Sequence, residues 1–175
     1  MVPVTWLNDL FTRWKSPRIA HAHCDIPCGI YDPHGAQIAA LTIVRMNQLI
    51  AELPKPGPQT TPEERDAYVH KLSRYTKVKE EHAEACKHEL RVIWGDYFTP
   101  DHLKQFPELH GLFWDAMKLA SKARQEISLQ VAQDLLAKVQ AIAEIFWKTK
   151  GATAHRQPSL QKSGGELLYP VAPSK

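Results

Sequence analysis

Residues 32–53 read DPHGAQIAALTIVRMNQLIAEL, and this stretch decides the fold. Asp32 and Pro33 are typical of a helix start, because an aspartate can cap the first turn and a proline at the first helical position loses no hydrogen bond. The apolar side chains on one predicted face recur every three or four residues; they are Ala39, Ile43, Met46, Ile50 and Leu53. The pattern predicts an amphipathic helix that ends at the proline-rich stretch 54–58.

Three further segments place apolar residues at helical spacing. Residues 61–64 (TPEE) form a capping box and predict a second helix that runs to Gly95. Residues 106–108 (FPE) are typical of the start of a third helix, and Ser128 can cap a fourth that ends at Gly151. Four amphipathic helices joined by modest loops predict an all-α fold, an up-and-down four-helix bundle.

The two ends of the chain differ from this central part. Residues 1–22 hold an apolar stripe at helical spacing but lack the unbroken apolar run of a secretory signal, so we interpret them as a leader that is cleaved off. Residues 152–175 contain several prolines and glycines and no sustained periodicity, which predicts a disordered tail. Residues 23–151 are therefore expected to form the single folded domain.

Composition limits the functions that the chain can have. A chain of 175 residues, 43% of them hydrophobic and 23% charged, is typical of a soluble globular protein. The net charge of +3 is too small for a protein whose main partner is a nucleic-acid backbone. No stretch approaches the roughly 18 consecutive apolar residues of a membrane span. Three cysteines, an odd number, favour a reducing compartment, and we expect a cytoplasmic protein.

The chemistry of the chain is expected near Cys24 and Cys28, which lie close together beside His23. This spacing is typical of metal ligands or redox thiols. On these three residues alone, a zinc half-site, a reversible disulfide and a chance arrangement all remain open.

Residues 23–33 (HCDIPCGIYDP) resemble the metal hook at the mature N-terminus of nickel-containing superoxide dismutases. The resemblance continues in residues 94–98 (WGDYF), 107–110 (PELH) and 145–150 (IFWKTK), and so covers about residues 23–151. It implies an enzyme that converts superoxide into oxygen and hydrogen peroxide with a nickel ion as cofactor. It also implies a homohexamer of right-handed four-helix bundles.

The resemblance further implies that a processing peptidase removes the leader between Ala22 and His23. Once His23 is the first residue, its amine and the backbone amide of Cys24 can chelate the same ion as the Cys24 sulfur, and Cys28 closes the plane. The His23 imidazole can then approach from the axial side. Because the amine and both thiols must lose protons, nickel loading is expected to weaken as pH falls.

Other hook residues take supporting roles by the same resemblance. Asp25 and Pro27 shape the hook, and Tyr31 stands over the open axial position, where its hydroxyl orients superoxide or an ordered water. In part of the family a glutamate on the first helix and an arginine on the second brace the axial imidazole. The corresponding positions of this sequence are Ala39 and His82.

Two other functions use the same residues. A nickel or copper binding and delivery protein would hold the metal without turnover, and a thiol redox sensor would join Cys24 and Cys28 in a disulfide. His82 and Cys86 are spaced i, i+4 and admit a second metal site, but a core thiol and a satisfied histidine are the favoured interpretation.

Overall fold

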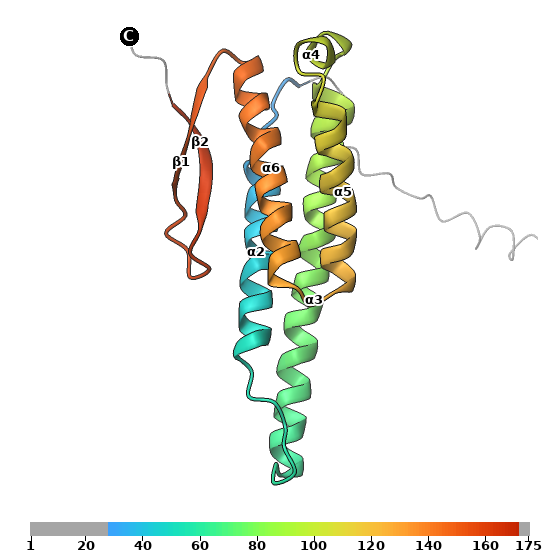
Figure 1. The fold of residues 1–175 in the computed structure, drawn as a ribbon, viewed down its shortest axis with the longest axis vertical. Helices are drawn as coiled ribbons and strands as arrows, with labels where there is room; N and C mark the ends of the chain where they lie inside the picture. The colour runs from blue at the N-terminus through green and yellow to red at the C-terminus, as the bar shows by residue number, and fades with distance from the viewer. Residues whose placement is uncertain (1–27, 172–175) are drawn as a thin grey trace, which may run out of the picture.

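The computed structural model describes residues 28–171, and four long helices dominate it (Figure 1). The helices are α2 (His34–Glu52), α3 (Pro62–Val92), α5 (Leu109–Gln125) and α6 (Leu129–Thr149). Each packs against two others, so that α2 contacts α3 and α6, and α5 contacts the same two helices. Successive helices run in opposite directions along the bundle (Figure 1). The predicted four-helix bundle is confirmed; the predicted leader lies outside the described residues.

Helices α3 and α6 begin close to the predicted residues because their capping groups act as expected. The Thr61 hydroxyl accepts a hydrogen bond from the Glu64 N–H at 3.2 Å, and the Glu64 carboxylate accepts one from the Thr61 N–H at 2.9 Å. Ser128 caps α6 through the N–H of Val131 at 3.3 Å. Each cap satisfies a backbone donor that the first helical turn leaves without a partner.

Aromatic side chains close the end of the bundle at which α2 and α5 begin and α3 and α6 end, called the hook end below. A π-helical turn, η1 (Ile93–Tyr97), and a short helix, α4 (Pro100–Gln105), connect α3 to α5 there. The ring centroids of Trp94 and Phe113 lie 4.7 Å apart, and those of Tyr97 and Phe146 lie 4.5 Å apart. Aromatic rings in contact with one another therefore fill the hook end of the bundle.

The predicted disordered tail, residues 152–175, is wrong for residues 153–171. Two strands, β1 (Thr153–Pro158) and β2 (Glu166–Val171), pair antiparallel with Thr153 opposite Val171. The hairpin lies against α2 and α6 (Figure 1). The side chains of Leu167 and Leu168 are buried beneath it. Residues 172–175 lie outside the described part of the chain.

Three glutamine side chains hold the backbone of the hairpin, and they explain why the tail is ordered. The buried Gln37 amide donates to the Leu168 carbonyl at 3.0 Å and accepts from the Leu168 N–H at 2.8 Å. Gln140 donates to the carbonyl of residue 166 at 2.7 Å, and Gln48 donates to the carbonyl of residue 163 at 3.0 Å. The ordering therefore depends on helices far away in the sequence.

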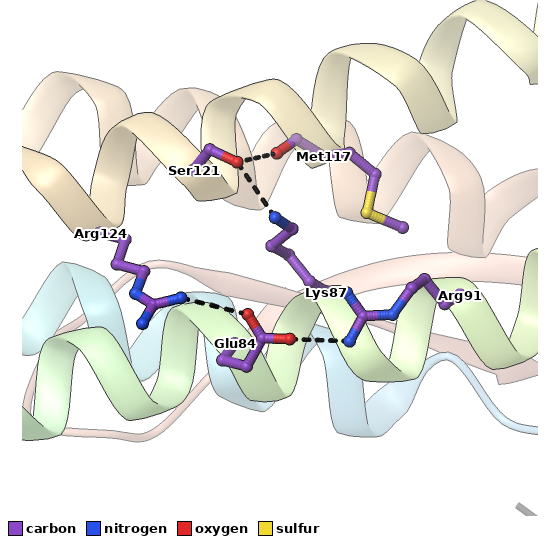
Figure 2. Close-up of polar contacts among 6 residues, drawn as sticks. All are labelled: Glu84, Lys87, Arg91, Met117, Ser121 and Arg124. Carbon is purple, nitrogen blue, oxygen red and sulfur yellow. Dashed lines mark hydrogen bonds and ion pairs between the residues drawn. The ribbon is translucent and has the colours of Figure 1, made fainter. Parts of the chain in front are cut away.

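Polar contacts join α3 and α5 along the middle of the bundle (Figure 2). Glu84 accepts hydrogen bonds from Arg91 at 2.7 Å and from Arg124 at 3.4 Å, while Lys87 donates to the Ser121 hydroxyl at 3.1 Å. The hydrogen bond from Arg91 is the main reason that the pKa of Glu84 lies below its ordinary value.

None of the helices described is long and apolar enough to cross a membrane.

Candidate metal centre

Cys28 is the predicted metal ligand that the structure describes, and it lies at the hook end directly before α2. Its side chain is exposed, and its sulfur accepts a hydrogen bond from the Ile30 N–H at 3.4 Å. Gly29 has a φ of 70°, a conformation that side chains with a Cβ rarely adopt, and it turns the chain at this point. The other predicted hook residues, Ala22, His23, Cys24, Asp25 and Pro27, lie outside the described residues.

Tyr31 packs on Tyr97, with ring centroids 5.6 Å apart and the rings tilted by 54°. The hydroxyl of Tyr97 lies 2.7 Å from that of Thr149, whose own proton is donated to the Phe146 carbonyl at 2.7 Å. The Tyr97 hydroxyl is therefore the donor of the first bond, which fixes its ring. Tyr31 therefore packs on the Tyr97 ring, whose hydroxyl is held by a hydrogen bond.

No role for Tyr97 was predicted from the sequence. The aromatic residues within 94–98 were the pattern from which such a role could have been inferred. The ammonium of Lys150 adds a positive charge beside this ring, 5.0 Å from the ring centroid of Tyr97 and 5.1 Å from that of Phe146. Both distances are within the range of cation–π attraction. The hook end therefore combines an exposed thiol, two packed tyrosines and a cation.

His82 and Cys86 do not form a second metal site. The Nδ1 of His82 donates to the Val78 carbonyl at 2.9 Å, one helical turn earlier. Burial raises the pKa of the Cys86 thiol to about 12, so it remains protonated. Between residues 28 and 171, no group of three or more His, Cys, Asp and Glu side chains is placed to hold a metal ion. The satisfied histidine and core thiol are as predicted.

The donor at Cys28 suits nickel. A thiolate is a soft and strongly donating ligand, and such ligands select copper, zinc and nickel over magnesium or calcium. The sulfur is exposed, and the other predicted ligands precede it in the sequence.

Comparison with known proteins identifies the family. The family model described as nickel-containing superoxide dismutase matches residues 18–150. The superoxide dismutase [Ni] of Streptomyces coelicolor is 36% identical over 144 residues, which cover 82% of this chain and all of that relative. The protein of the same name from Streptomyces seoulensis is 35% identical over the same shares. The chain belongs to the nickel-containing superoxide dismutase family.

Solved structures of the family share the fold. A native nickel superoxide dismutase superimposes with a TM-score of 0.63 at 37% identity, covering 73% of this chain and 99% of that one. The metal-free form of a nickel superoxide dismutase gives a TM-score of 0.60 at 34% identity, with 70% and 99% covered. The β1–β2 hairpin lies beyond residue 150, where the family match ends.

Membership of the nickel superoxide dismutase family decides between the functions that the sequence left open. The protein is a nickel-dependent oxidoreductase that dismutates superoxide. A delivery protein without turnover and a thiol sensor are no longer needed to explain the cysteines.

Proposed function

We propose that this nickel superoxide dismutase is made as a precursor and that His23, Cys24 and Cys28 hold one nickel ion per subunit after residues 1–22 are removed. The observation that carries the proposal is the exposed Cys28 sulfur at the hook end, four residues after Cys24 and three residues before Tyr31, whose ring packs on Tyr97. The family match, which begins at residue 18 and so includes the whole hook, also supports it.

When bound, nickel supplies one-electron exchange between its divalent and trivalent states, which anionic sulfur and amide donors make attainable. The chain supplies the surroundings. Asp25 and Pro27 give the hook its shape. By the resemblance to the family, we assign to the Tyr31 hydroxyl the orientation of superoxide or of an ordered water. The Tyr97 hydroxyl donates its proton to Thr149. The Tyr97 ring keeps Tyr31 in place for this role.

Lys150 favours the approach of the substrate. Superoxide is an anion, and a cation near the mouth of a site raises the local concentration of anions and their rate of encounter. The Lys150 ammonium lies over the Tyr97 ring and is exposed to solvent. Its field therefore acts at the hook end rather than within the bundle.

We also propose that the mature enzyme is a cytoplasmic homohexamer that a peptidase activates by cutting between Ala22 and His23. The match to two curated relatives over their full length supports a shared mature form. The odd number of cysteines supports a reducing compartment.

The test is to purify the protein from its native host and determine its N-terminus, metal content, mass in solution and activity. We expect a chain that begins at His23, one nickel ion per chain, the mass of six chains and nickel-dependent dismutation. An active, nickel-loaded protein that still begins at Met1 would contradict the proposed ligand set, because its first ligand would be a peptide nitrogen instead of an amine.

A further inference from the structure

The first half of α3 extends beyond the end of α5. α3 has 31 residues, whereas its neighbour α5 has 17. The buried Lys79 ammonium marks the level at which α5 ends, because it donates to three carbonyls between residues 123 and 126 at 2.6–2.9 Å. Residues 62–78 therefore lie past α5, and there α3 is accompanied by α2 and the loop that joins the two helices (Figure 1).

A groove runs along α3 where α5 no longer covers it. Its α3 side chains recur at helical spacing and so share one face of the helix; they are Val69, Leu72, Ser73, Thr76, Lys77, Glu80, Glu81 and Glu84. Arg124 of α5 pairs with Glu84 at 3.4 Å and closes one end of the groove (Figure 2). Val69 is 60% exposed and Leu72 is partly exposed. Aliphatic side chains exposed on an uncovered helix face are typical of an interaction surface.

No remaining segment of the mature chain is long enough to reach the centre of this groove. If the chain begins at His23, the segments outside the described residues are 23–27 and 172–175, and both adjoin the hook end. Leu72 lies 20 residues before Val92, the end of α3, which is about 30 Å along the helix. Five extended residues span at most about 18 Å. A molecule that covers the groove is therefore a separate chain.

The charges along this face are arranged so that it complements itself. The face continues past Val69 to Arg65 and Asp66, three and four residues earlier, which are exposed. At the other end it carries Lys77 and Glu80. Each end thus holds one charge of each sign, and the side chains between them on the face are uncharged.

An antiparallel pair of α3 helices brings opposite charges together. With the two-fold axis between residues 72 and 73, Arg65 of each copy lies opposite Glu80 of the other, and Asp66 comes within one turn of Lys77. A parallel pair would set each charge against its own kind, which is unfavourable. Two-fold symmetry uses the same patch on both copies, so every contact occurs twice.

We propose that the exposed face of the first half of α3 binds the same face of a second copy of the mature chain, antiparallel, with Arg65–Glu80 pairs flanking Val69 and Leu72. The partner's α3 then lies where α5 would continue if it were as long as α3. The inference rests on the proposed function in taking the mature chain to begin at His23 and to assemble with its own copies, and it does not involve the nickel ion.

The test is charge reversal, followed by sedimentation of the cleaved enzyme over a range of concentrations. Glu80→Arg and Arg65→Glu should each lower the mass to that of a smaller assembly and raise the concentration at which the wild-type assembly dissociates by about 100-fold, since like charges meet at two places. The double variant restores both pairs with their signs exchanged and should recover the wild-type mass. Within one chain the two residues lie about 22 Å apart along α3, so this rescue reports a contact between copies.

Lys71→Glu is the matched control, because it makes the same change of charge as Arg65→Glu on the side of α3 away from the groove. It should leave the mass unchanged. Arg65 also donates to the carbonyls of Thr60 and Gly57, so the thermal midpoint of each variant is followed by circular dichroism. A loss of stability inside one chain would not be rescued by the second reversal.

The outcomes separate this inference from the proposed function. Single reversals that leave the mass unchanged, or a double variant that stays dissociated, would overturn the inference alone. A cleaved wild-type enzyme that is monomeric would overturn it together with the homohexamer, whereas its nickel content would still report on the metal site. A protein that assembles and responds to the reversals but holds no nickel at His23 would support the inference and overturn the proposed ligand set.

Discussion

Residues 28–33 and the β1–β2 hairpin are both non-helical segments that adjoin α2, but they are held in opposite ways. The first segment exposes Cys28 and Ile30, packs the Tyr31 ring on Tyr97 and buries Pro33 where it enters α2. The hairpin buries Leu167 and Leu168 and bonds its backbone to three glutamines. The segment with the proposed metal ligand and the segment that is anchored to the helices are therefore different non-helical parts of this enzyme.

The largest expected effect comes from the exposed segment. Replacing Cys28→Ser should reduce nickel-dependent activity to background, because the proposed thiolate ligand is lost. The free energy of unfolding of the metal-free protein should change by less than about 0.5 kcal/mol, since the side chain is exposed. A superoxide assay and urea denaturation measure the two quantities.

Cys86→Ser is the control for this prediction, because it changes a buried thiol. It should cost about 1–3 kcal/mol of stability and leave the activity per nickel unchanged. Nickel-dependent dismutation that survives in the Cys28→Ser protein would show that the exposed sulfur is not a ligand.

The second effect concerns the hairpin. Gln37→Ala leaves both the N–H and the carbonyl of Leu168 buried without partners, which should cost about 2–4 kcal/mol. Gln48→Ala removes one bond at a partly buried site and should cost about 1 kcal/mol. Urea denaturation followed by circular dichroism measures both, and the activity per nickel should be that of the wild type. Equal costs for the two variants would mean that Gln37 does not fix the hairpin.

A smaller effect is expected for the charge at the hook end. Lys150→Gln should lower kcat/KM a few-fold at low ionic strength and make its dependence on salt shallower, because a steering cation is removed. Lys148→Gln is the control, since the Lys148 ammonium already pairs with Glu144 at 2.8 Å. Pulse radiolysis at several salt concentrations gives the slopes, and parallel slopes for the wild type and Lys150→Gln would exclude steering by this residue.

The smallest effect is expected for Glu84, which lies in neither of the two segments compared above. Arg91 lowers the pKa of Glu84 in the folded protein, so the stabilisation is present above the ordinary carboxyl pKa and is lost as pH falls through the lowered one. Glu84→Gln should therefore cost less than about 1 kcal/mol at neutral pH, and its difference from the wild type should vanish in acid. Unfolding curves across this pH range measure it, and a difference that grows in acid would contradict the assignment.

The helices could be predicted from the sequence because their signals are local. The capping box at Thr61 and the serine cap at residue 128 each satisfy a backbone donor within the same turn. The buried face of α2 was predicted less well. Ala39 and Ile43 are buried, but Met46 and Ile50 are only partly so, while Gln37 and Leu41 are buried instead.

The hairpin explains this difference, because it covers a second face of α2 that a bundle alone would leave exposed. Its ordering depends on Gln37 and Leu168, which are 131 positions apart, and no local pattern carries such a signal. The candidate site shows the same division. Cys28 and Tyr31 belong to a short motif that the sequence reveals, whereas Tyr97 and Lys150 join them only through the fold.

The depth of Cys86 within α3 has a consequence for an enzyme whose product is hydrogen peroxide. Peroxide attacks thiolates at accessible positions, and a thiol that is both enclosed and protonated escapes this oxidation. Cys86 meets both conditions, since no part of it reaches solvent and burial keeps its proton in place. The Cys86 thiol in the interior of the bundle is thereby protected from oxidation by the peroxide that each catalytic cycle produces.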